Sequence, residues 1–316
     1  MYGKIGTRNC HQEVRQMKIY IGAPRGFCAG VVRAIDLVEI ALERFGTPVY
    51  VKHQIVHNSH VVDSLEAKGA ITVEDVDDIP EGSKVVFSAH GSPPEDFAKA
   101  EARGLDVIDA TCPLVTKVHN EAIRYDGEDR RIILVGHRGH QEVKGTMGQT
   151  GMHLVDDREE MNLPDWDDDT PVAVLTQTTL SVDDTKRSID DIQNKFSNAI
   201  IRNDLCYATT NRQSAVKEIT DKIDVMLVIG APNSSNCNRL REVAEAQDVP
   251  AYLLNGLDEL RPEWLEGAEN VGITSGASTP EYLVQQVIDA LEPDEVIEVE
   301  VAKEDITFVL PKELRD

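Results

Sequence analysis

The sequence predicts an α/β protein built from three small domains, related by a pseudo-threefold axis and arranged as a trefoil around a central cavity. Two observations lead to this prediction. Strand-like and helix-like segments alternate along most of the chain, which favours parallel sheets. The alternation also recurs three times, and each recurrence contains a cysteine at the same place. The alternative of one long doubly wound sheet would leave this recurrence unexplained.

Each repeat opens with a strand, a cysteine and a helix. The cysteines Cys28, Cys112 and Cys206 follow short strand-like runs, and apolar residues recur at roughly helical spacing in the segments after them, as in residues 29–45. The expected strands, each ending in its cysteine, are 18–28, 106–112 and 199–206, and the expected helices are 29–45, 113–125 and 207–223.

Two further β-rich runs and a closing helix complete each repeat. The first β-rich runs are 47–58, 131–142 and 224–236; the second are 84–93, 171–181 and 270–280; the closing helices are 94–104, 182–196 and 280–291. We expect the first α/β repeat to span 30–111, the second 112–202, and the third 17–29 together with 203–297, because the N-terminal strand is expected to join the third repeat. Residues 1–16 are then an N-terminal extension and residues 298–316 a C-terminal tail.

Composition narrows the class of protein. The chain has 316 residues, with 56 acidic and 32 basic side chains and a net charge of −24, which repels nucleic acid and anionic membranes. No apolar run approaches the roughly 20 residues that span a bilayer, and the polar N-terminus does not resemble a signal peptide. We therefore expect a cytoplasmic protein, a monomer, that binds neither nucleic acid nor membrane.

The five cysteines do not form a pattern typical of disulfides. Their number is odd, and no CxxC pair is present, which disfavours both a disulfide framework and a zinc ribbon. Cys10 and Cys237 lie outside the threefold repeat, so we expect neither to take part in a site.

Polar side chains follow the β-rich runs of all three repeats. Ligands of parallel α/β sheets bind beyond the carboxyl ends of the strands, so a trefoil would bring these residues to one cavity. Each has a common structural explanation, as an N-cap or a hydrogen-bonded histidine, but the same chemistry at equivalent positions favours a site. The strand ends are His57-Asn58, His140-Gln141-Glu142, Ser234-Ser235-Asn236, His90-Gly91-Ser92, Thr176-Gln177-Thr178 and Ser275-Gly276-Ala277-Ser278.

Three converging thiolates suit a 4Fe–4S cluster. Such clusters normally take four cysteines, so Cys28, Cys112 and Cys206 would leave one apical iron open to an exogenous ligand. A zinc ion held by three thiolates and a water molecule is the alternative. The spread of the cysteines over three repeats favours the cluster, since zinc ligands usually lie close together in sequence.

The other strand-end residues fall into two chemical classes. Donors suited to phosphate oxygens are His57, His90, Ser234, Asn236 and Ser278. Groups with acid–base capacity are His140, Glu142 and Thr178, of which Glu142 is the expected proton donor because it is the one carboxylate at these strand ends. The glycine-rich run with Gly22, Gly26 and Gly30 lacks the spacing of a phosphate loop and suggests close backbone packing beside the cluster.

A set of ordered motifs resembles the 4-hydroxy-3-methylbut-2-enyl diphosphate reductases of the non-mevalonate isoprenoid pathway. The resemblance covers about residues 17–314. The motifs are GFCAGV, QIVHN, SAHGSP, DATCPLVTKVH, GHRGHQEVKGTMGQ, TQTTLSVDDT, CYATTNRQ, NSSNCNRL, GASTPE and FVLPKEL.

The resemblance implies a trefoil around a 4Fe–4S cluster on Cys28, Cys112 and Cys206. It implies reductive dehydroxylation of an allylic diphosphate to isopentenyl and dimethylallyl diphosphates, with a ferredoxin or flavodoxin as electron donor. Diphosphate contacts would come from His57, His90, Ser234, Ser235, Asn236 and Ser278. His140, Glu142 and Thr178 would surround the hydroxymethyl group of the substrate.

Two residues depart from the family pattern: Gln141 stands where proline is usual, and Cys237 stands where serine is common. Two rival functions remain. One is another three-cysteine cluster enzyme, such as a quinolinate synthase, against which the NSSN and GHRGHQE strings argue. The other is a non-catalytic zinc-binding or cluster-binding regulator, which would not need Glu142 and the histidines beside its metal.

Overall fold

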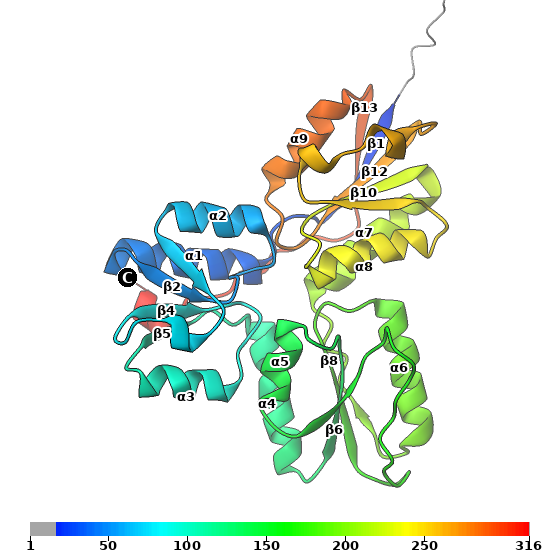
Figure 1. Ribbon diagram of the computed structural model, residues 1–316. Coiled ribbons are helices and arrows are strands. Elements are labelled where there is room, and N and C mark those ends of the chain that lie inside the picture. The colour runs from blue at the N-terminus through cyan, green and yellow to red at the C-terminus, as the bar shows by residue number, and fades with distance from the viewer. Residues whose placement is uncertain (1–16, 316) are drawn as a thin grey trace, which may run out of the picture.

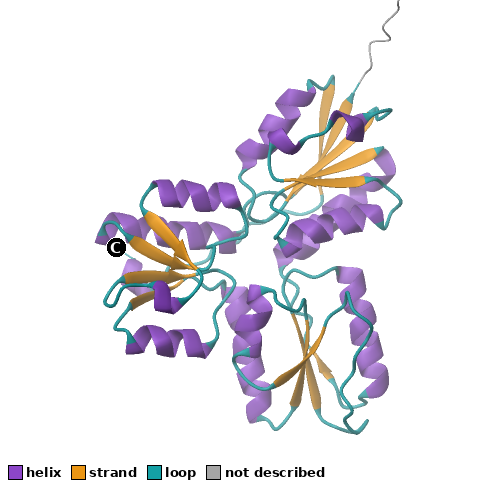
Figure 2. Ribbon diagram, viewed as in Figure 1, coloured by secondary structure: helices purple, strands orange, loops and turns teal. Residues whose placement is uncertain are grey.

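A computed structural model describes residues 17–315, which form three parallel β-sheets in three lobes around a common centre (Figure 1). Helices flank the sheet of each lobe (Figure 2). The prediction of an α/β fold with three such units is confirmed. The predicted N-terminal extension, residues 1–16 with Cys10, lies outside the described residues.

The first sheet has the strand order β3-β2-β4-β5. Its strands are β2 (Val49–Lys52), β3 (Ala70–Val73), β4 (Lys84–Phe87) and β5 (Asp106–Asp109). Helices α1 (Ala29–Phe45) and α2 (Ser59–Ala67) share one apolar core with this sheet, while α3 (Pro94–Ala102) and the 3-10 turn η1 (Val76–Asp78) share a second.

The second sheet repeats this order as β7-β6-β8-β9. Its strands are β6 (Arg131–Val135), β7 (Met152–Val155), β8 (Val172–Thr176) and β9 (Ile200–Ile201). Helices α4 (Pro113–Gly127) and α5 (Gln141–Met147) pack in one core, and α6 (Val182–Lys195) packs in the other.

The third sheet has the order β11-β10-β12-β1-β13, the same plan with one more strand. Its strands are β1 (Lys18–Ala23), β10 (Val225–Ile229), β11 (Ala251–Leu254), β12 (Asn270–Ser275) and β13 (Glu295–Glu300), and its helices are α7 (Tyr207–Ile219), α8 (Ser235–Glu245) and α9 (Glu281–Leu291). Short 3-10 helices are η2 (Thr220–Lys222), η3 (Leu257–Glu259), η4 (Pro262–Leu265) and η5 (Lys312–Leu314). Strand β1 pairs in parallel with β12 and β13.

The chain crosses from one lobe to the next at each of the three cysteines. β5 belongs to the first sheet, whereas α4, which starts just after Cys112, packs in one core of the second lobe. In the same way Cys206 lies between β9 and α7, and Cys28 lies between β1 and α1. The domain boundaries stay a prediction, but β13 runs through residue 298, where the tail was expected to begin.

The apolar character of the strands explains why the polar residues gather at their ends. All five residues of β8 and all five of β10 are buried, as expected where helices cover both faces of a parallel sheet. Most polar side chains of this region therefore follow the strands, and Thr176 and Ser275 lie at the last position of theirs. None of the described helices is long and apolar enough to cross a membrane.

After β13 the chain leaves the third lobe and returns to the first, and we call residues 301–314 the C-terminal strap. Glu304 of the strap accepts hydrogen bonds from Arg212 Nη1 (2.9 Å) and Asn211 Nδ2 (3.1 Å) of α7. Further along, Val309 O accepts a hydrogen bond from Arg33 Nε (3.1 Å), and Leu314 is buried in the core of the first lobe. The strap thus ties the first lobe to the third.

Candidate active site

One cavity of about 120 Å³ lies where the three lobes meet. Every site residue expected from the sequence lines it, although they come from three sheets. These residues are Cys28, His57, His90, Cys112, His140, Glu142, Thr178, Cys206, Ser234, Ser235, Asn236 and Ser278. The tertiary structure therefore brings the predicted set together, while the role of each residue stays a prediction.

The three cysteines occupy equivalent positions, each as the N-cap of a helix: α1, α4 and α7. The backbone N–H of each donates to a carbonyl that follows a neighbouring strand (β12, β4 or β8) in the sheet whose strand precedes the cysteine. The acceptor oxygens belong to Ala277 for Cys28 (3.2 Å), Ala89 for Cys112 (3.0 Å) and Thr178 for Cys206 (3.1 Å). Helix N-termini favour negative charge, so all three sites suit thiolates.

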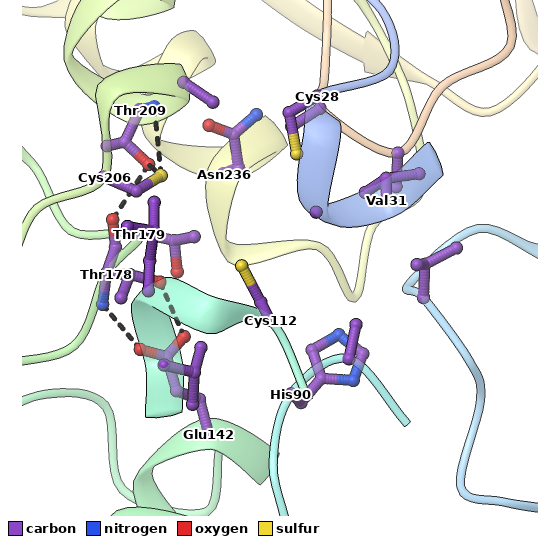
Figure 3. Close-up of a pocket in the computed structure, with 18 of the residues that line it drawn as sticks. Cys28, Val31, His90, Cys112, Glu142, Thr178, Thr179, Cys206, Thr209 and Asn236 are labelled. Atoms are coloured by element: carbon purple, nitrogen blue, oxygen red, sulfur yellow. Dashed lines mark hydrogen bonds between the residues drawn. The ribbon is translucent and has the colours of Figure 1, made fainter. Parts of the chain in front are cut away.

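The three sulfur atoms point into the same space (Figure 3). Burial raises the pKa of Cys112 to about 12 and that of Cys206 to about 11, and repulsion between the thiolates contributes. A bound cation is what would hold three such groups as thiolates together. Gly30 leaves room beside them, because a Cβ at this position would lie 2.8 Å from Cys112 Sγ. These residues fit a metal cluster.

Cys237 lies apart from this group. Its side chain is fully buried in the apolar core between α7, α8 and β10, with Gly230 and Gly276 packed closely against its sulfur. Cys237 does not line the cavity, and the expectation that it takes no part in the site stays a prediction.

Glu142 is the buried carboxyl group of the cavity. It is 3% exposed, and Thr178 donates to both of its oxygens, from the backbone N to Oε1 (2.6 Å) and from Oγ1 to Oε2 (3.0 Å) (Figure 3). Burial raises the pKa of Glu142 to about 7, although the two hydrogen bonds from Thr178 act in the opposite direction. Near neutral pH this group can therefore both hold and release a proton.

His140 is the N-cap of α5, and its Nδ1 accepts a hydrogen bond from the backbone N–H of Glu142 (3.2 Å). This contact fixes the tautomer of a neutral ring, so that Nε2 carries the proton. Burial, with smaller contributions from neighbouring histidines, lowers the pKa of His140 to about 3. The ring is therefore a neutral N–H donor at physiological pH.

His57 and His90 stack with their ring centroids 3.9 Å apart. Burial lowers the pKa of His57 to about 4 and that of His90 well below its usual value, and repulsion between the histidines adds to both effects. Both rings are neutral while no anion is near them. A bound polyanion would raise both pKa values, because opposite charge favours the protonated form.

Asn236 gives the clearest sign of an absent ligand. It is 5% exposed, and neither its amide nitrogen nor its carbonyl oxygen has a hydrogen-bond partner among residues 17–315. Buried side-chain amides are nearly always hydrogen-bonded in folded proteins. Beside it, Ser235 Oγ donates to Thr179 O (3.0 Å), and across the cavity Ser278 Oγ donates to His57 O (3.0 Å).

Thr179 lines the cavity but was not expected from the sequence. Ala89, Thr178 and Ala277 are equivalent, because each accepts a hydrogen bond from a cysteine N–H. The residues that follow them, His90, Thr179 and Ser278, are then equivalent as well. Aligning the second β-rich runs of the three repeats would have identified Thr179. Tyr207 and Phe308 also line the cavity, and only the fold reveals Phe308, which comes from the C-terminal strap.

Comparison with known proteins identifies the family. Residues 19–292 match the family model described as LytB protein. The chain belongs to the LytB family. Members of this family contain an iron–sulfur cluster, which agrees with the chemistry of the three cysteines.

Curated relatives carry one enzyme name. A protein from Hahella chejuensis is 51% identical over 310 residues, which cover 95% of this chain and 98% of the relative. A second, from Bradyrhizobium diazoefficiens, is 53% identical over 306 residues, covering 94% and 99%. Both are named 4-hydroxy-3-methylbut-2-enyl diphosphate reductase, the latter with the suffix 2.

Solved structures agree with the LytB assignment. The reductase from Plasmodium falciparum, titled E-1-hydroxy-2-methyl-but-2-enyl-4-diphosphate reductase, superposes with a TM-score of 0.89 at 38% identity and covers 95% of this chain and 97% of its own. A second structure, titled as the terminal enzyme of the non-mevalonate pathway, superposes with a TM-score of 0.62 at 33% identity, covering 87% and 99%.

Proposed function

We propose that the protein is a 4-hydroxy-3-methylbut-2-enyl diphosphate reductase, which converts its substrate to isopentenyl and dimethylallyl diphosphate by reductive dehydroxylation. The observation that carries the proposal is the shared cavity. Three cysteines, a carboxyl group with a pKa of about 7 and a set of anion donors all line it. The reaction removes one hydroxyl group as water and consumes two electrons and two protons.

The cysteines Cys28, Cys112 and Cys206 would hold a 4Fe–4S cluster that leaves one iron without a protein ligand. When bound, such a cluster supplies electrons and Lewis acidity. A zinc ion with the same ligands would supply Lewis acidity but no electrons, and the membership of an iron–sulfur family argues against it. The same membership argues against a quinolinate synthase or a regulatory protein.

The diphosphate end of the substrate is bound by residues from the first and third lobes. The unpaired Asn236 amide donates to a phosphate oxygen, and so does the hydroxyl of Ser234, whose Oγ accepts a hydrogen bond from the backbone N–H of Cys237. Ser235 and Ser278 contribute once their hydroxyls turn from Thr179 O and His57 O to the anion. His57 and His90 take up protons as the anion binds, since both are neutral beforehand. The first residues of α8 add backbone N–H groups, which favour phosphate at a helix N-terminus.

Glu142 delivers the proton that lets the hydroxyl oxygen leave as water. Thr178 holds both carboxyl oxygens in place, and His140 presents its Nε2–H toward the hydroxymethyl group. Because Glu142 is buried, its proton passes to the substrate rather than to bulk water. The second proton, to the allylic carbon skeleton, has no single donor among these residues.

The reaction needs an external electron source, for which a ferredoxin or a flavodoxin is the proposed partner. The cytoplasmic location and the monomeric state expected from the sequence also stay predictions.

The deciding experiment is anaerobic reconstitution with iron and sulfide, followed by turnover of the allylic diphosphate with reduced methyl viologen. We expect four irons per chain and formation of both isomers. Cys28→Ser, Cys112→Ser and Cys206→Ser should each lose iron and activity, whereas the matched control Cys237→Ser should keep both. Full iron content and turnover in the three ligand variants would refute the ligand assignment.

A further inference from the structure

His53 and Glu74 form a pair at the carboxyl edge of the first sheet. His53 follows β2 and Glu74 follows β3, and the register of the two strands places Lys52 beside Val73. The backbone N–H of His53 continues this ladder by donating to Val73 O (2.7 Å). Directly beyond it, His53 Nδ1 lies 2.7 Å from Glu74 Oε2, so the carboxylate holds the imidazole.

The backbone of His53 is in the left-handed region, with φ of 61°. Residues other than glycine seldom adopt this conformation, because Cβ crowds the backbone. Such strain persists where the surroundings impose it, and it is concentrated at functional sites. Here it turns the chain sharply at the end of β2, immediately before the loop that carries His57.

The His53 ring lies edge-on to both stacked histidines of the cavity. Its centroid is 5.6 Å from that of His57, at an interplanar angle of 87°, and 5.8 Å from that of His90, at 76°. One ring nitrogen from each of the three lies within 4.8 Å of the others. His53 Nε2 is buried and has no hydrogen-bond partner within the part of the chain that the structure describes, and the same holds for His57 Nε2. His53 itself does not line the cavity.

We propose that His53 and Glu74 are positioning residues for diphosphate binding, acting through His57 and His90; this inference rests on the proposed function. Glu74 fixes the His53 ring with Nδ1 toward the carboxylate, which leaves Nε2 directed at the two cavity histidines. When His57 and His90 donate N–H groups to the bound anion, the pair of His53 and Glu74 behind them orients their rings and supplies a carboxylate. The pair therefore sets diphosphate affinity and leaves bond cleavage untouched.

Two amides that replace different halves of the imidazole test this proposal. Asparagine places its amide near Nδ1 and glutamine places it near Nε2. His53→Asn should therefore keep a polar group facing Glu74 but lose the group that faces His57 and His90. His53→Gln should keep a polar group facing His57 and His90, and with it part of the ability to orient their rings. The probe is inorganic pyrophosphate, titrated calorimetrically into the reconstituted holoenzyme, with kcat, KM and iron content measured in parallel.

We expect His53→Asn and Glu74→Gln each to weaken pyrophosphate binding and raise KM by roughly tenfold, the effect of about one lost hydrogen bond to a charged group. kcat and iron content should each change by less than about twofold, well below the tenfold change expected in affinity. His53→Gln should recover part of the affinity. The double variant should weaken binding no more than either single one, because the two residues act as a unit.

His153→Asn is the matched control. His153 Nε2 lies 2.7 Å from Asn162 O in the second lobe, and its replacement should leave affinity unchanged. If wild type neither binds pyrophosphate nor turns over substrate, the proposed function itself fails. Unchanged affinity in His53→Asn and Glu74→Gln, with a functional wild type, overturns the positioning role alone. A fall in kcat and iron content without a change in affinity would also overturn it, since it indicates a structural role.

Discussion

At the scale of single residues, Glu142 joins two properties that a proton donor needs: burial and a fixed orientation. Replacing it by glutamine keeps the shape and the contact with Thr178 but removes the proton. We expect Glu142→Gln to bind substrate with little change and to lose turnover by about 10²-fold or more, the range for positioned acid–base groups. Single-turnover kinetics together with substrate titration would separate the two effects. Loss of affinity with an unchanged rate per bound complex would contradict the assignment.

The raised pKa of Glu142 also predicts how pH acts. The protonated form donates, so the rate should fall as pH rises through about 7. Because the folded state holds this proton more tightly than the unfolded chain, stability due to Glu142 should decrease between about pH 4.5 and about pH 7. Urea unfolding of the apoprotein at several pH values measures this slope, which Glu142→Gln should reduce. An identical slope in the variant would exclude the effect.

Asn236 should show opposite effects on binding and on folding. Its amide is buried without partners in the absence of ligand, so truncation to alanine removes an unpaired polar group. We expect Asn236→Ala to leave the stability of the apoprotein unchanged or slightly higher, while pyrophosphate binding weakens by about 1–3 kcal/mol. Thermal unfolding and calorimetry report the two quantities. A large loss of stability would instead indicate that Asn236 supports the fold.

At the scale of elements, the start of α1 shows how a helix can shape a cluster site. A Cβ on Gly30 would lie 2.8 Å from Cys112 Sγ and 3.8 Å from Cys28 Sγ. Gly30→Ala should therefore lower the iron bound after reconstitution by at least about half, although alanine favours a helix over glycine by roughly 0.5–1 kcal/mol. Gly127→Ala in α4, where a Cβ would meet no atom within 4 Å, is the control. Equal iron content in both variants would contradict this reading.

At the scale of the whole molecule, the C-terminal strap is a further crossing between lobes and, within the described residues, contains no cysteine. Arg212 is fully buried, and its pairing with Glu304 anchors the strap before Phe308 reaches the cavity. Glu304→Gln should destabilise the fold by about 3 kcal/mol, because the buried guanidinium loses its counter-charge. Alkylation of Cys28 and Cys206 in the apoprotein should also become faster. Val309→Ala, at a side chain that is 68% exposed, should change neither measurement.

If the proposed electron donor is acidic, the net charge of −24 predicts repulsion between the two proteins. Salt shortens the Debye length from about 30 Å at 0.01 M to about 8 Å at 0.15 M, so moderate salt should speed electron transfer if net repulsion controls the encounter. Turnover with a protein donor, measured against ionic strength with a small neutral reductant as control, tests this. A steep fall with salt, seen with the protein donor alone, would instead indicate attraction at a local basic docking face.

The repeated α/β plan and the cysteines, histidines, serines and Glu142 that line the cavity follow from the sequence, whereas Thr179 and Phe308 were missed. Apolar runs must be buried, and parallel strands must end in the same direction, so polar residues after equivalent runs, such as Glu142 and Asn236, had to meet once the three units met. The cysteines followed from the same recurrence. That each cysteine is an N-cap at a crossing between lobes becomes clear only from the pairing of the strands into sheets. In the sequence alone, a short strand and the helix after it do not reveal that they belong to different units.

The residues that support the cavity set from behind become visible only in the folded structure. The contacts of His53 with Glu74 and of Arg212 with Glu304 join segments whose spacing has no periodicity to detect. The pKa of Glu142 likewise depends on burial by residues from several elements, which composition does not encode. The physical reason is the same in each case: a hydrophobic pattern specifies which face of an element is buried, but desolvation and hydrogen bonding depend on what the other elements bring to that face.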